Sequence, residues 1–584
     1  MGIKLAKTAG FCMGVRRAVD LVLDIAQHKG KERVYTYGPL IHNPQTVELL
    51  KTRGIIPISN INDIDASDKG AAIIIRAHGI SPEERKKIKE KGIKIVDATC
   101  PKVAHVQSII KKHVSLNYTV LIIGDKEHPE VNGLLGYAYG KGLVLGSVND
   151  VENLPPLDRV CVVAQTTQSV DEFIDIVNRL KARFPDTVVF DTICDSTEKR
   201  QAEVKSLAAE MDAIFIVGGR NSANTKRLVR ISELEGKPTF HIETADELDE
   251  IPASRYENIG ISAGASTPNW IIERVVDSIM DNQSEKEQKG KRLFKFWMFT
   301  VRTDIYSAIG AGCLSFSSML LQRHDINIFN IIIASLYVYA MHTLNRLMDR
   351  KTSTIIGSFR EETYRKQGKT YITAAIVCMI LALISSFFAG INAFVLLFLI
   401  SALGALYNTQ ILPEDWRFRS FKDLPGSKNI FVAIAWAAVV AVLPQIETGL
   451  AITPGMIVAF LFTFGIVFVR SAISDILDIQ SDRLIGRETI PVLIGKKPTQ
   501  ILLTAILALL LILLSISYPF GWTSSVSFAL LICIFFMWIY FNLYDRRAQF
   551  SGAVQEGILE TSYIVAGISS LMWLCLTWFF NLRI

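Results

Sequence analysis

The stretch AIFIVGGRNSANTKRLV, residues 213–229, shows the local pattern that decides the fold of the first half of the chain. An apolar run rich in β-branched residues ends in two glycines, and a polar segment then leads into a helical pattern. The same order recurs in AAIIIRAHGI (71–80), IKIVDATCPKVAHVQSII (93–110), TVLIIGDKEHPEVNG (119–133) and IGISAGASTPNWIIERVV (259–276). This alternation predicts an α/β fold with parallel sheets, in which polar residues at the carboxyl ends of strands face a ligand crevice.

The chain of 584 residues is too long for one ordinary domain, and its two halves differ in character. Charged residues are spread through the chain up to about Asp281, whereas long apolar runs dominate beyond about Phe296. We therefore predict an α/β domain at 1–282, a charged linker without hydrophobic periodicity at 283–296, and an all-α transmembrane domain at 297–584. The linker is expected to end in a basic segment at the membrane edge.

Charge and the N-terminus restrict the class of protein. The formal net charge of +6 is mild and spread out, so no nucleic-acid partner is expected. The opening MGIKLAKTAG lacks the apolar core of a signal peptide, which predicts a cytoplasmic first domain without disulfides. Four further cysteines lie in apolar stretches and are interpreted as small hydrophobic residues: Cys313, Cys378, Cys533 and Cys575.

Three cysteines of the first half share a setting. Cys12 lies between two glycines at the predicted start of a helix, where the helix dipole favours a thiolate that ligates a metal or acts as a nucleophile. Cys100 follows it by 88 residues and Cys194 follows Cys100 by 94, which suggests three related α/β units that each supply one thiol. The alternative for Cys12 is a small apolar residue in a tight turn. Cys161, inside the strand-like RVCVVAQ, is interpreted as a core residue.

Three distant thiolates indicate a metal cluster assembled from separate loops. A [4Fe–4S] cluster held by three cysteines leaves one iron open, which could act on a substrate oxygen and conduct electrons. The alternative is that these are scattered buried cysteines, and their spacing does not decide between the two.

Eight motifs occur in an order that resembles the hydroxymethylbutenyl diphosphate reductase (LytB) family: GFCMGVRRA, IHNPQTV, RAHG, DATCPKV, HPEVNG, QTT, NSANTKRL and AGASTP. The resemblance covers about residues 1–282 and implies that Cys12, Cys100 and Cys194 hold the cluster. It also implies that the substrate diphosphate is bound by His42, His78, His128, Ser222, Asn224 and Ser266. At Ala223 the family often has a serine, so its backbone amide is expected to take part instead.

The resemblance also implies the chemistry. Glu130 is expected to donate a proton, and the Thr166 hydroxyl is expected to connect Glu130 to the substrate alcohol. We expect the pKa of Glu130 to be raised in the negative field of cluster and diphosphate. Two electrons from an external donor such as ferredoxin or flavodoxin would release the allylic hydroxyl as water, giving isopentenyl and dimethylallyl diphosphate.

The second half contains nine candidate membrane spans, centred near residues 309, 335, 380, 400, 437, 461, 509, 532 and 570. Basic loops follow the second, fourth, sixth and eighth spans, whereas the opposite loops have few lysines or arginines. The positive-inside rule therefore predicts a multi-pass protein of the cytoplasmic membrane, with the basic loops and the α/β domain in the cytoplasm and Ile584 outside.

Two acidic motifs lie at the cytoplasmic ends of the second and sixth spans. Asn345 and Asp349 share one helix face, and three more carboxylates repeat at three- and four-residue steps: Asp475, Asp478 and Asp482. Carboxylates near hydrocarbon are costly and usually functional, and facing pairs of this kind can hold Mg²⁺ on a diphosphate. The alternative is that they only pair with Arg346 and Arg483.

This half resembles the UbiA superfamily of membrane prenyltransferases over about residues 297–580. DILDIQSDRLIGRETIPVLIG and YNTQIL with FKDLPGSKN carry the resemblance, whereas Ser353 stands where a further aspartate is common. It implies Mg²⁺-assisted loss of diphosphate from an allylic substrate and transfer to a lipid or aromatic acceptor. We therefore expect a bifunctional isoprenoid protein. The alternatives are a membrane-tethered redox sensor and a reductase on an inactive membrane anchor.

Overall fold

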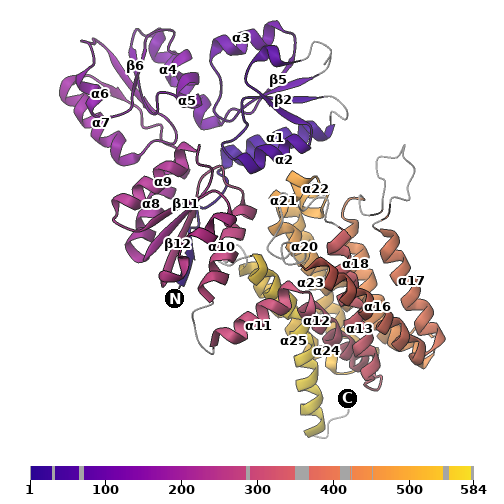
Figure 1. Ribbon diagram of the computed structural model, residues 1–584. Helices are drawn as coiled ribbons and strands as arrows, with labels where there is room; N and C mark the ends of the chain where they lie inside the picture. Colours follow the sequence, from indigo (N-terminus) through magenta and orange to yellow (C-terminus); the bar gives the residue numbers. More distant parts are fainter. Residues whose placement is uncertain are drawn as a thin grey trace. The chain divides into compact units, whose positions relative to one another are not determined.

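The computed structural model describes residues 2–28, 33–64, 71–284, 290–348, 367–407, 409, 421, 424–449, 451–543 and 552–579. The chain divides into two compact units, Met1–Gln283 and Ser284–Ile584, and each is described by itself (Figure 1). Part of the predicted linker is helical, because α10 runs to Ser284 and the amphipathic helix α11 begins at Gly290. The prediction that the linker lacks hydrophobic periodicity is therefore wrong for residues 290–296, because they form the first part of the amphipathic helix α11.

The described residues of the first unit form three four-stranded sheets, in which every strand pair is parallel. One has the order β3 (Ile55–Ile58), β2 (Val34–Tyr37), β4 (Ala72–Ile75), β5 (Lys94–Asp97). The next has β7 (Gly142–Leu145), β6 (Thr119–Ile123), β8 (Val160–Ala164), β9 (Val188–Val189). The third has β11 (Thr239–Ile242), β10 (Ala213–Val217), β12 (Asn258–Ala263), β1 (Gly2–Leu5). The prediction of parallel α/β units is confirmed.

The three sheets share one strand order. In each sheet the second strand along the chain lies at one edge, and the first, third and fourth strands follow it across the sheet. In the third sheet the fourth place is taken by β1, which comes from the start of the chain. Gly2 of β1 pairs with Asn258 of β12, and the register continues to Leu5 and Ile261. The first residues of the chain therefore complete the last unit, and Cys12 follows the strand that does so.

Helices follow the strands because the sequence supplies start signals at their first residues. Proline is the first residue of α2, α3, α4 and α5, and Ser81 forms a capping box with Glu84 before α3. The helices of this unit are α1 (Met13–His28), α2 (Pro44–Thr52), α3 (Pro82–Glu90), α4 (Pro101–Ser115), α5 (Pro129–Gly136), α6 (Asn149–Glu152), α7 (Val170–Arg183), α8 (Asp195–Glu210), α9 (Ala223–Leu234) and α10 (Asn269–Ser284), with short 3₁₀ turns at Ile61–Asp63, Ala245–Glu250 and Ala253–Arg255.

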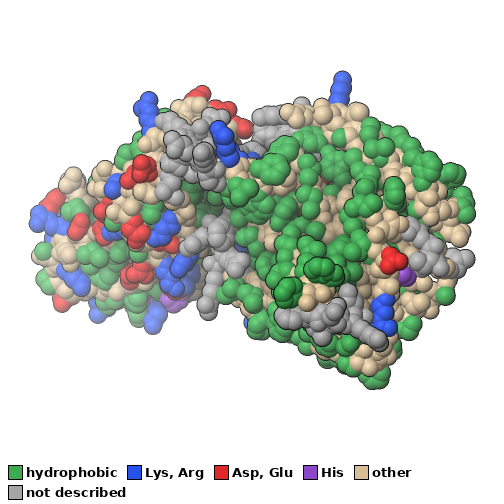
Figure 2. Space-filling model, turned by 90° about the horizontal axis from the view of Figure 1, so that it is seen from below, with side chains coloured by type: hydrophobic (Ala, Val, Ile, Leu, Met, Phe, Trp, Pro, Cys, Tyr) green, Lys and Arg blue, Asp and Glu red, His purple; other side chains and the backbone are tan. Residues whose placement is uncertain are grey.

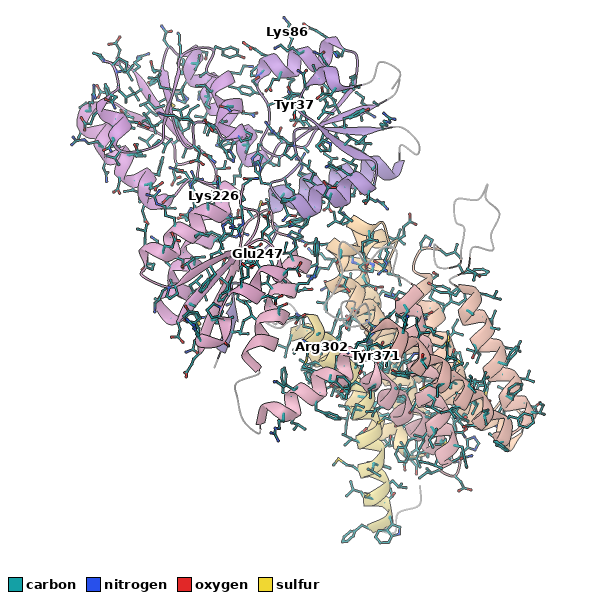
Figure 3. The ribbon with its side chains drawn as sticks, viewed as in Figure 1. Tyr37, Lys86, Lys226, Glu247, Arg302 and Tyr371 are labelled. Carbon is teal, nitrogen blue, oxygen red and sulfur yellow. The ribbon has the colours of Figure 1, made fainter. Side chains whose placement is uncertain are left out.

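The central strands of this unit are covered on both faces. All residues of β4, β8 and β10 are buried, which explains their continuous apolar runs. Charged side chains remain on the outside of the unit, as Figures 2 and 3 show, for example Lys86 on α3 and Lys226 on α9.

The second unit is all helical. Its helices are α11 (Gly290–Arg302), α12 (Ile305–Leu321), α13 (Ile328–Met348), α16 (Gly368–Ala389), α17 (Ile391–Tyr407), α18 (Ser427–Ala437), the π-helix η5 (Ala438–Val442), α19 (Leu443–Thr448), α20 (Pro454–Leu477), α21 (Ile479–Ile485), α22 (Ile490–Ile494), α23 (Lys496–Ser517), α24 (Val526–Leu543) and α25 (Gly552–Phe579). Each of the nine predicted span centres falls within one of these helices.

Length and composition make this unit a multi-pass membrane domain. In the part of the chain that is described, seven helices are long and apolar enough to cross a membrane, or eight if the pair α11 and α12, bent by 81°, is one span. The remaining predicted centre lies in α17, a shorter apolar helix. Only 17% of the apolar window of α16 and 28% of that of α23 are buried, so their outer faces are suited to lipid. Apolar side chains cover most of this unit in Figure 2.

Candidate functional site

The three cysteines occupy equivalent places in the three α/β units. Cys100 and Cys194 are the N-cap residues of α4 and α8, and Cys12 directly precedes α1. The Val15 backbone N–H lies 3.4 Å from Cys12 Sγ, and Cys194 Sγ lies 3.2 Å from the Ser196 hydroxyl. Each sulfur therefore lies at the positive end of a helix, which favours a thiolate.

The three thiols converge on one region. A Cβ added to Gly14 would lie 2.6 Å from Cys100 Sγ and 3.9 Å from Cys12 Sγ, so this glycine leaves room between two of them. Burial raises the pKa of Cys100, and the neighbouring thiols of Cys12 and Cys194 raise it further. The Arg200 guanidinium, which is 2% exposed, lies within electrostatic reach of Cys12 and Cys194 and donates to the Gly10 carbonyl oxygen at 2.7 Å.

The sulfur spacing fits a group larger than one ion. A tetrahedral zinc site places sulfurs about 3.8 Å apart, given Zn–S bonds of about 2.3 Å. Among the described residues only three histidines, and not the three cysteines, place their ligand atoms all within 4.8 Å of one another. Three thiols that meet from three helix N-termini at wider spacing fit an iron–sulfur cluster.

Cys161 lies in β8 among apolar side chains and is fully buried. Burial raises its pKa to about 12, so it remains a protonated thiol. Its interpretation as a core residue is confirmed.

Three histidines from different segments form a second cluster. The ring centroids of His42, His78 and His128 lie 4.9 Å, 5.7 Å and 5.1 Å apart. His128 caps α5, and its Nδ1 accepts the Glu130 backbone N–H at 3.2 Å, so in the neutral ring Nε2 carries the hydrogen and is a donor. The buried Nε2 of His42 has no hydrogen-bond partner among the described residues.

Burial keeps two of these rings neutral. The pKa of His42 is lowered to about 3 by burial and by the nearby His78, His128 and Arg76. The pKa of His128 is lowered to about 4, chiefly by burial and then by His78. At neutral pH both rings therefore offer N–H groups to a ligand without carrying charge.

Glu130 and Thr166 form a buried pair beside the histidines. The carboxylate of Glu130, which is 1% exposed, accepts the Thr166 backbone N–H at 2.7 Å and the Thr166 hydroxyl at 2.9 Å, and His78 Nδ1 lies 3.8 Å away. Burial raises the pKa of Glu130, but the hydrogen bond of His78, the electrostatic effects of His78 and His128 and the Thr166 N–H outweigh it, so the net pKa is lowered. The predicted increase is therefore not produced by the protein's own groups.

The remaining predicted ligands lie at the N-terminus of α9 and after β12. Ser222 is the N-cap residue of α9, Ala223 is its first residue, and both side-chain polar atoms of the buried Asn224 lack hydrogen-bond partners within the chain. The Ser266 hydroxyl donates to the His42 carbonyl oxygen at 3.2 Å, which joins this group to the histidine cluster. Uncommitted polar groups at a helix N-terminus suit a diphosphate.

The acidic residues of the second unit are arranged differently from the prediction. Asp475 and Asp482 are 3% and 5% exposed, whereas Asp478 is exposed at the junction between α20 and α21. Burial, and then the charge of Asp475, raises the pKa of Asp482 to about 6. Asn345 lies near the end of α13, while Asp349 and Ser353 are outside the described residues.

Residues 428 and 429 contact the second acidic motif. The Asn429 amide donates to Asp475 Oδ2 at 2.7 Å, and Lys428 Nζ lies 3.6 Å from Asp475 Oδ1. Arg346 lies 3.0 Å from the buried Asp304. The carboxylates of the second motif can hold a metal ion, and the Lys428 ammonium can pair with a diphosphate beside it.

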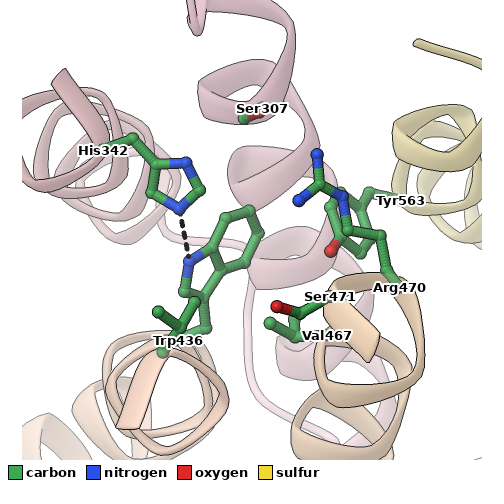
Figure 4. A pocket seen from close by; sticks show the side chains of 8 residues that line it. Ser307, His342, Trp436, Val467, Arg470, Ser471 and Tyr563 are labelled. Atoms are coloured by element: carbon green, nitrogen blue, oxygen red, sulfur yellow. Dashed lines mark hydrogen bonds between the residues drawn. The ribbon is translucent and has the colours of Figure 1, made fainter. Parts of the chain in front are cut away.

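A small cavity of about 20 Å³ lies within the helical bundle (Figure 4). Trp436 donates to His342 Nε2 at 3.2 Å on one side, and Arg470 and Tyr563 lie on the other. Arg470 is ion-paired with the buried Glu560 of α25. The lining residues are Ser307, His342, Val432, Trp436, Val467, Arg470, Ser471 and Tyr563.

Comparisons with known proteins match each half of the chain to a family. Residues 3–280 match the family model described as LytB protein, and residues 309–555 match the UbiA prenyltransferase family. A protein of Geobacter sp. (strain M21) named 4-hydroxy-3-methylbut-2-enyl diphosphate reductase is 43% identical over 286 residues, which make up 49% of this chain and 99% of that protein. The chain belongs to the LytB family. Its second half carries a UbiA prenyltransferase domain.

Other LytB relatives match the same half. The Aquifex aeolicus protein of the same name is 43% identical over 283 residues, 48% of this chain and 96% of its own length. The Plasmodium falciparum reductase structure is 31% identical, with a TM-score of 0.45 over 47% of this chain and 86% of that one. A UbiA homolog from Archaeoglobus fulgidus, solved with DMAPP and Mg²⁺, is 14% identical, with a TM-score of 0.35 over 47% of this chain and 99% of that one.

Sequence reasoning missed several residues that the structure brings to these sites. In the LytB unit, Arg200 lies behind the cysteines, and its spacing from Val204 and Leu207 on the buried face of α8 is a helical signal that could have identified it. In the UbiA domain, Asn429 and Glu560 had no local signal, because their partners lie 46 and 90 residues away.

Proposed function

We propose that the LytB unit reduces 4-hydroxy-3-methylbut-2-enyl diphosphate to isopentenyl and dimethylallyl diphosphate. The observation that carries this proposal is the meeting, within one unit, of three helix-capping thiols, a three-histidine cluster and the Glu130–Thr166 pair. The relatives named for this activity match the unit over nearly their whole length. A redox sensor is not favoured, since it would need no diphosphate-binding groups.

The chain's own residues bind and orient the substrate. The rings of His42, His78 and His128 donate N–H groups to the diphosphate, and the α9 N-terminus with Ser222, Ala223 and Asn224 adds further donors. Ser266 lies next to His42 and completes the set. Because His42 and His128 are neutral, these two rings bind the diphosphate through hydrogen bonds and not through ion pairs.

Glu130 and Thr166 handle the proton. The Thr166 hydroxyl donates to Glu130 Oε2. Once Glu130 has taken up a proton beside the bound diphosphate, whose negative charge favours the carboxylic acid, a proton passed from the Thr166 hydroxyl to the departing substrate oxygen is replaced from the Glu130 carboxyl group. When bound by Cys12, Cys100 and Cys194, a [4Fe–4S] cluster supplies electrons and a Lewis-acidic iron. Overall the allylic C–O bond breaks, two electrons and two protons are consumed, and water and the five-carbon diphosphate leave.

The test uses the full chain, purified without oxygen and supplied with chemically reduced viologen and the substrate. We expect both five-carbon diphosphates to form, and Cys194→Ser to abolish their formation. A preparation with its full complement of iron and sulfide that consumes no substrate would contradict the proposal. The natural electron donor is then sought by replacing viologen with ferredoxin or flavodoxin.

We further propose that the UbiA domain is an active Mg²⁺-dependent prenyltransferase. Asn345, Asp349, Asp475, Asp478 and Asp482 would hold the metal and the prenyl diphosphate. Support comes from the buried and electrostatically coupled Asp475 and Asp482 and from Lys428 beside them, since developing charge on a leaving diphosphate needs cations. The acceptor would be a lipid or an aromatic compound. An inactive anchor is not favoured, because buried carboxylates are costly to retain in a passive domain.

The transferase test compares two substitutions in the full chain. Asp478→Asn is expected to abolish Mg²⁺-dependent release of diphosphate from an allylic donor, whereas Ser353→Asp is expected to leave it unchanged or increase it. Membranes are assayed with labelled prenyl diphosphates of several lengths and extracted lipids. If the wild-type protein neither binds nor cleaves any of these donors, the anchor alternative takes the place of the transferase.

The arrangement in the cell follows from both activities. We propose domain limits of 1–282 and 297–584 with the linker at 283–296, the acidic motifs and the LytB unit on the cytoplasmic side, and Ile584 outside. Support comes from the basic loops and from the need of both activities for cytoplasmic diphosphates. Accessibility of residues near each loop to an impermeant reagent in intact cells tests this topology.

A further inference from the structure

Arg200 is a buried cation that joins the segments carrying two of the three cysteines in the LytB unit. It lies on α8, whose N-cap residue is Cys194, and it is 2% exposed. Its Nε donates to the Thr8 carbonyl oxygen at 3.1 Å, and its Nη2 donates to the same oxygen and, at 2.7 Å, to the Gly10 carbonyl oxygen. One guanidinium therefore fixes two carbonyl groups of the backbone that leads to Cys12.

Glu203, on the same helix, binds the N–H groups of the same segment. Its carboxylate accepts the Lys7 and Thr8 backbone N–H groups at 2.7 Å and 2.9 Å and the Thr8 hydroxyl at 2.6 Å. Residues three apart on a helix share one face, so α8 presents the guanidinium and the carboxylate to this segment together. The segment before Cys12 is thereby held to the helix that begins after Cys194.

These contacts leave Arg200 with an unused donor and a positive charge. Its Nη1 is buried and has no hydrogen-bond partner among the described residues. Burial lowers the pKa of Arg200, and the charges of Cys12, Glu203 and Cys194 oppose this effect. A guanidinium stays protonated in proteins, and the carbonyl oxygens that it binds are neutral. Glu203 is half-exposed, so water screens its charge more than that of Arg200.

We infer that Arg200 is a positioning residue of the cluster site, which holds the Cys12 segment against α8 and whose buried positive charge favours the reduced cluster. An electron from the donor adds one negative charge to the cluster, and a cation in a place without water stabilises that state. Hydrogen bonds to sulfur act in the same direction, and the unpaired Nη1 N–H is suited to one. The inference rests on the proposed reductase function, because it requires that a cluster is bound.

The test measures the reduction potential of the cluster in the full-length protein, purified without oxygen, by a redox titration followed in the visible spectrum. Arg200→Gln removes the charge. We expect the ratio of reduced to oxidised cluster at a fixed potential to fall at least about tenfold, which equals a potential lower by about 59 mV for one electron. Arg200→Lys keeps a charge without the planar group that binds both carbonyl oxygens. We expect its ratio to lie within about threefold of the wild-type value, and its cluster to be lost faster on dilution.

Lys102→Gln is the matched control for the charge. Lys102 also lies within electrostatic reach of two cysteines, Cys100 and Cys194, but its side chain is 48% exposed and is paired with Asp195 at 3.0 Å. Because water screens this charge, we expect its loss to change the ratio by less than about threefold. A change as large as that in Arg200→Gln would show that the burial of Arg200 is unimportant, which would overturn the inference.

Glu203→Gln separates the effect of charge from that of a loosened segment. It weakens contacts to the same backbone but removes a negative charge, so we expect the potential to stay unchanged or to rise. An equal lowering of the potential in Glu203→Gln and Arg200→Gln would overturn the inference, since a structural effect alone would explain both. If Arg200→Gln holds no cluster, Arg200→Lys decides: a ratio within threefold of the wild-type value supports the charge role, and a larger fall overturns it. A full cluster with the wild-type potential in Arg200→Gln overturns this inference and leaves the reductase proposal standing, whereas a wild-type protein without a cluster contradicts the reductase proposal itself.

Discussion

Gly14 offers a sharp test of the cluster site, because replacing it by alanine should remove the cluster without unfolding the protein. Gly14 lies in the first turn of α1, and alanine is the better helix former by up to about 1 kcal/mol. The added Cβ would lie 2.6 Å from Cys100 Sγ and 3.3 Å from Cys100 Cβ. Since carbon contacts normally begin at about 3.5 Å, the sulfur must move by about 0.9 Å. Metal ligands tolerate only about 0.2 Å, so the displaced thiol should no longer ligate.

The cluster content is measured by iron and sulfide analysis and by the visible spectrum of the full-length protein purified without oxygen. Folding is measured by circular dichroism. Gly133→Ala is the matched control, because Gly133 also lies in a helix but its added Cβ would be 3.6 Å from the nearest atom, an ordinary contact. We expect a colourless, folded Gly14→Ala protein and a brown Gly133→Ala protein. A full cluster in Gly14→Ala would refute the placement of the cluster between Cys12 and Cys100.

Three further outcomes are expected. Cys161→Ser should keep the cluster, because this thiol is fully buried within strand β8 and its raised pKa keeps it protonated, whereas Cys194→Ser should lose it. The reverse iron contents would show that the ligands are misassigned. Glu130→Gln should keep the size of the side chain beside Thr166 but lower turnover by about 10²–10⁴-fold, as is usual for loss of a general acid. A turnover rate close to that of the wild-type protein would show that another residue is the general acid. The LytB unit should become less stable as the pH falls from about 6.5 toward 3, because the unfolded chain takes up a proton at His42 over this range while the folded one, with a pKa of about 3, does not. The loss of stability is measured by hydrogen exchange of the β2 and β4 backbone amides at pH 7 and pH 5, and it should be smaller in His42→Asn than in the wild-type protein. An equal loss in both proteins would show that groups other than His42 cause the pH dependence.

Local sequence determined much of this protein. Strand, turn and helix follow one another in the first 280 residues because apolar β-branched runs, glycines and helix-starting prolines act over a few neighbours. The cysteines at helix N-termini, the core position of Cys161 and the nine apolar segments were predictable for the same reason. These are contacts and preferences within one turn or one strand.

Only the tertiary structure decided features that join distant segments. The pairing of β1 with β12, the burial of Arg200 behind the cysteines and the approach of Asn429 to Asp475 have no signature within a sequence window. The direction of the Glu130 pKa shift likewise depends on histidines brought from other segments, which outweigh its burial. The pairing of Arg470 in α20 with Glu560 in α25, 90 residues later in the chain, also has no local signal. Electrostatic energies depend on distances and on solvent exclusion, and both are known only once the chain has packed.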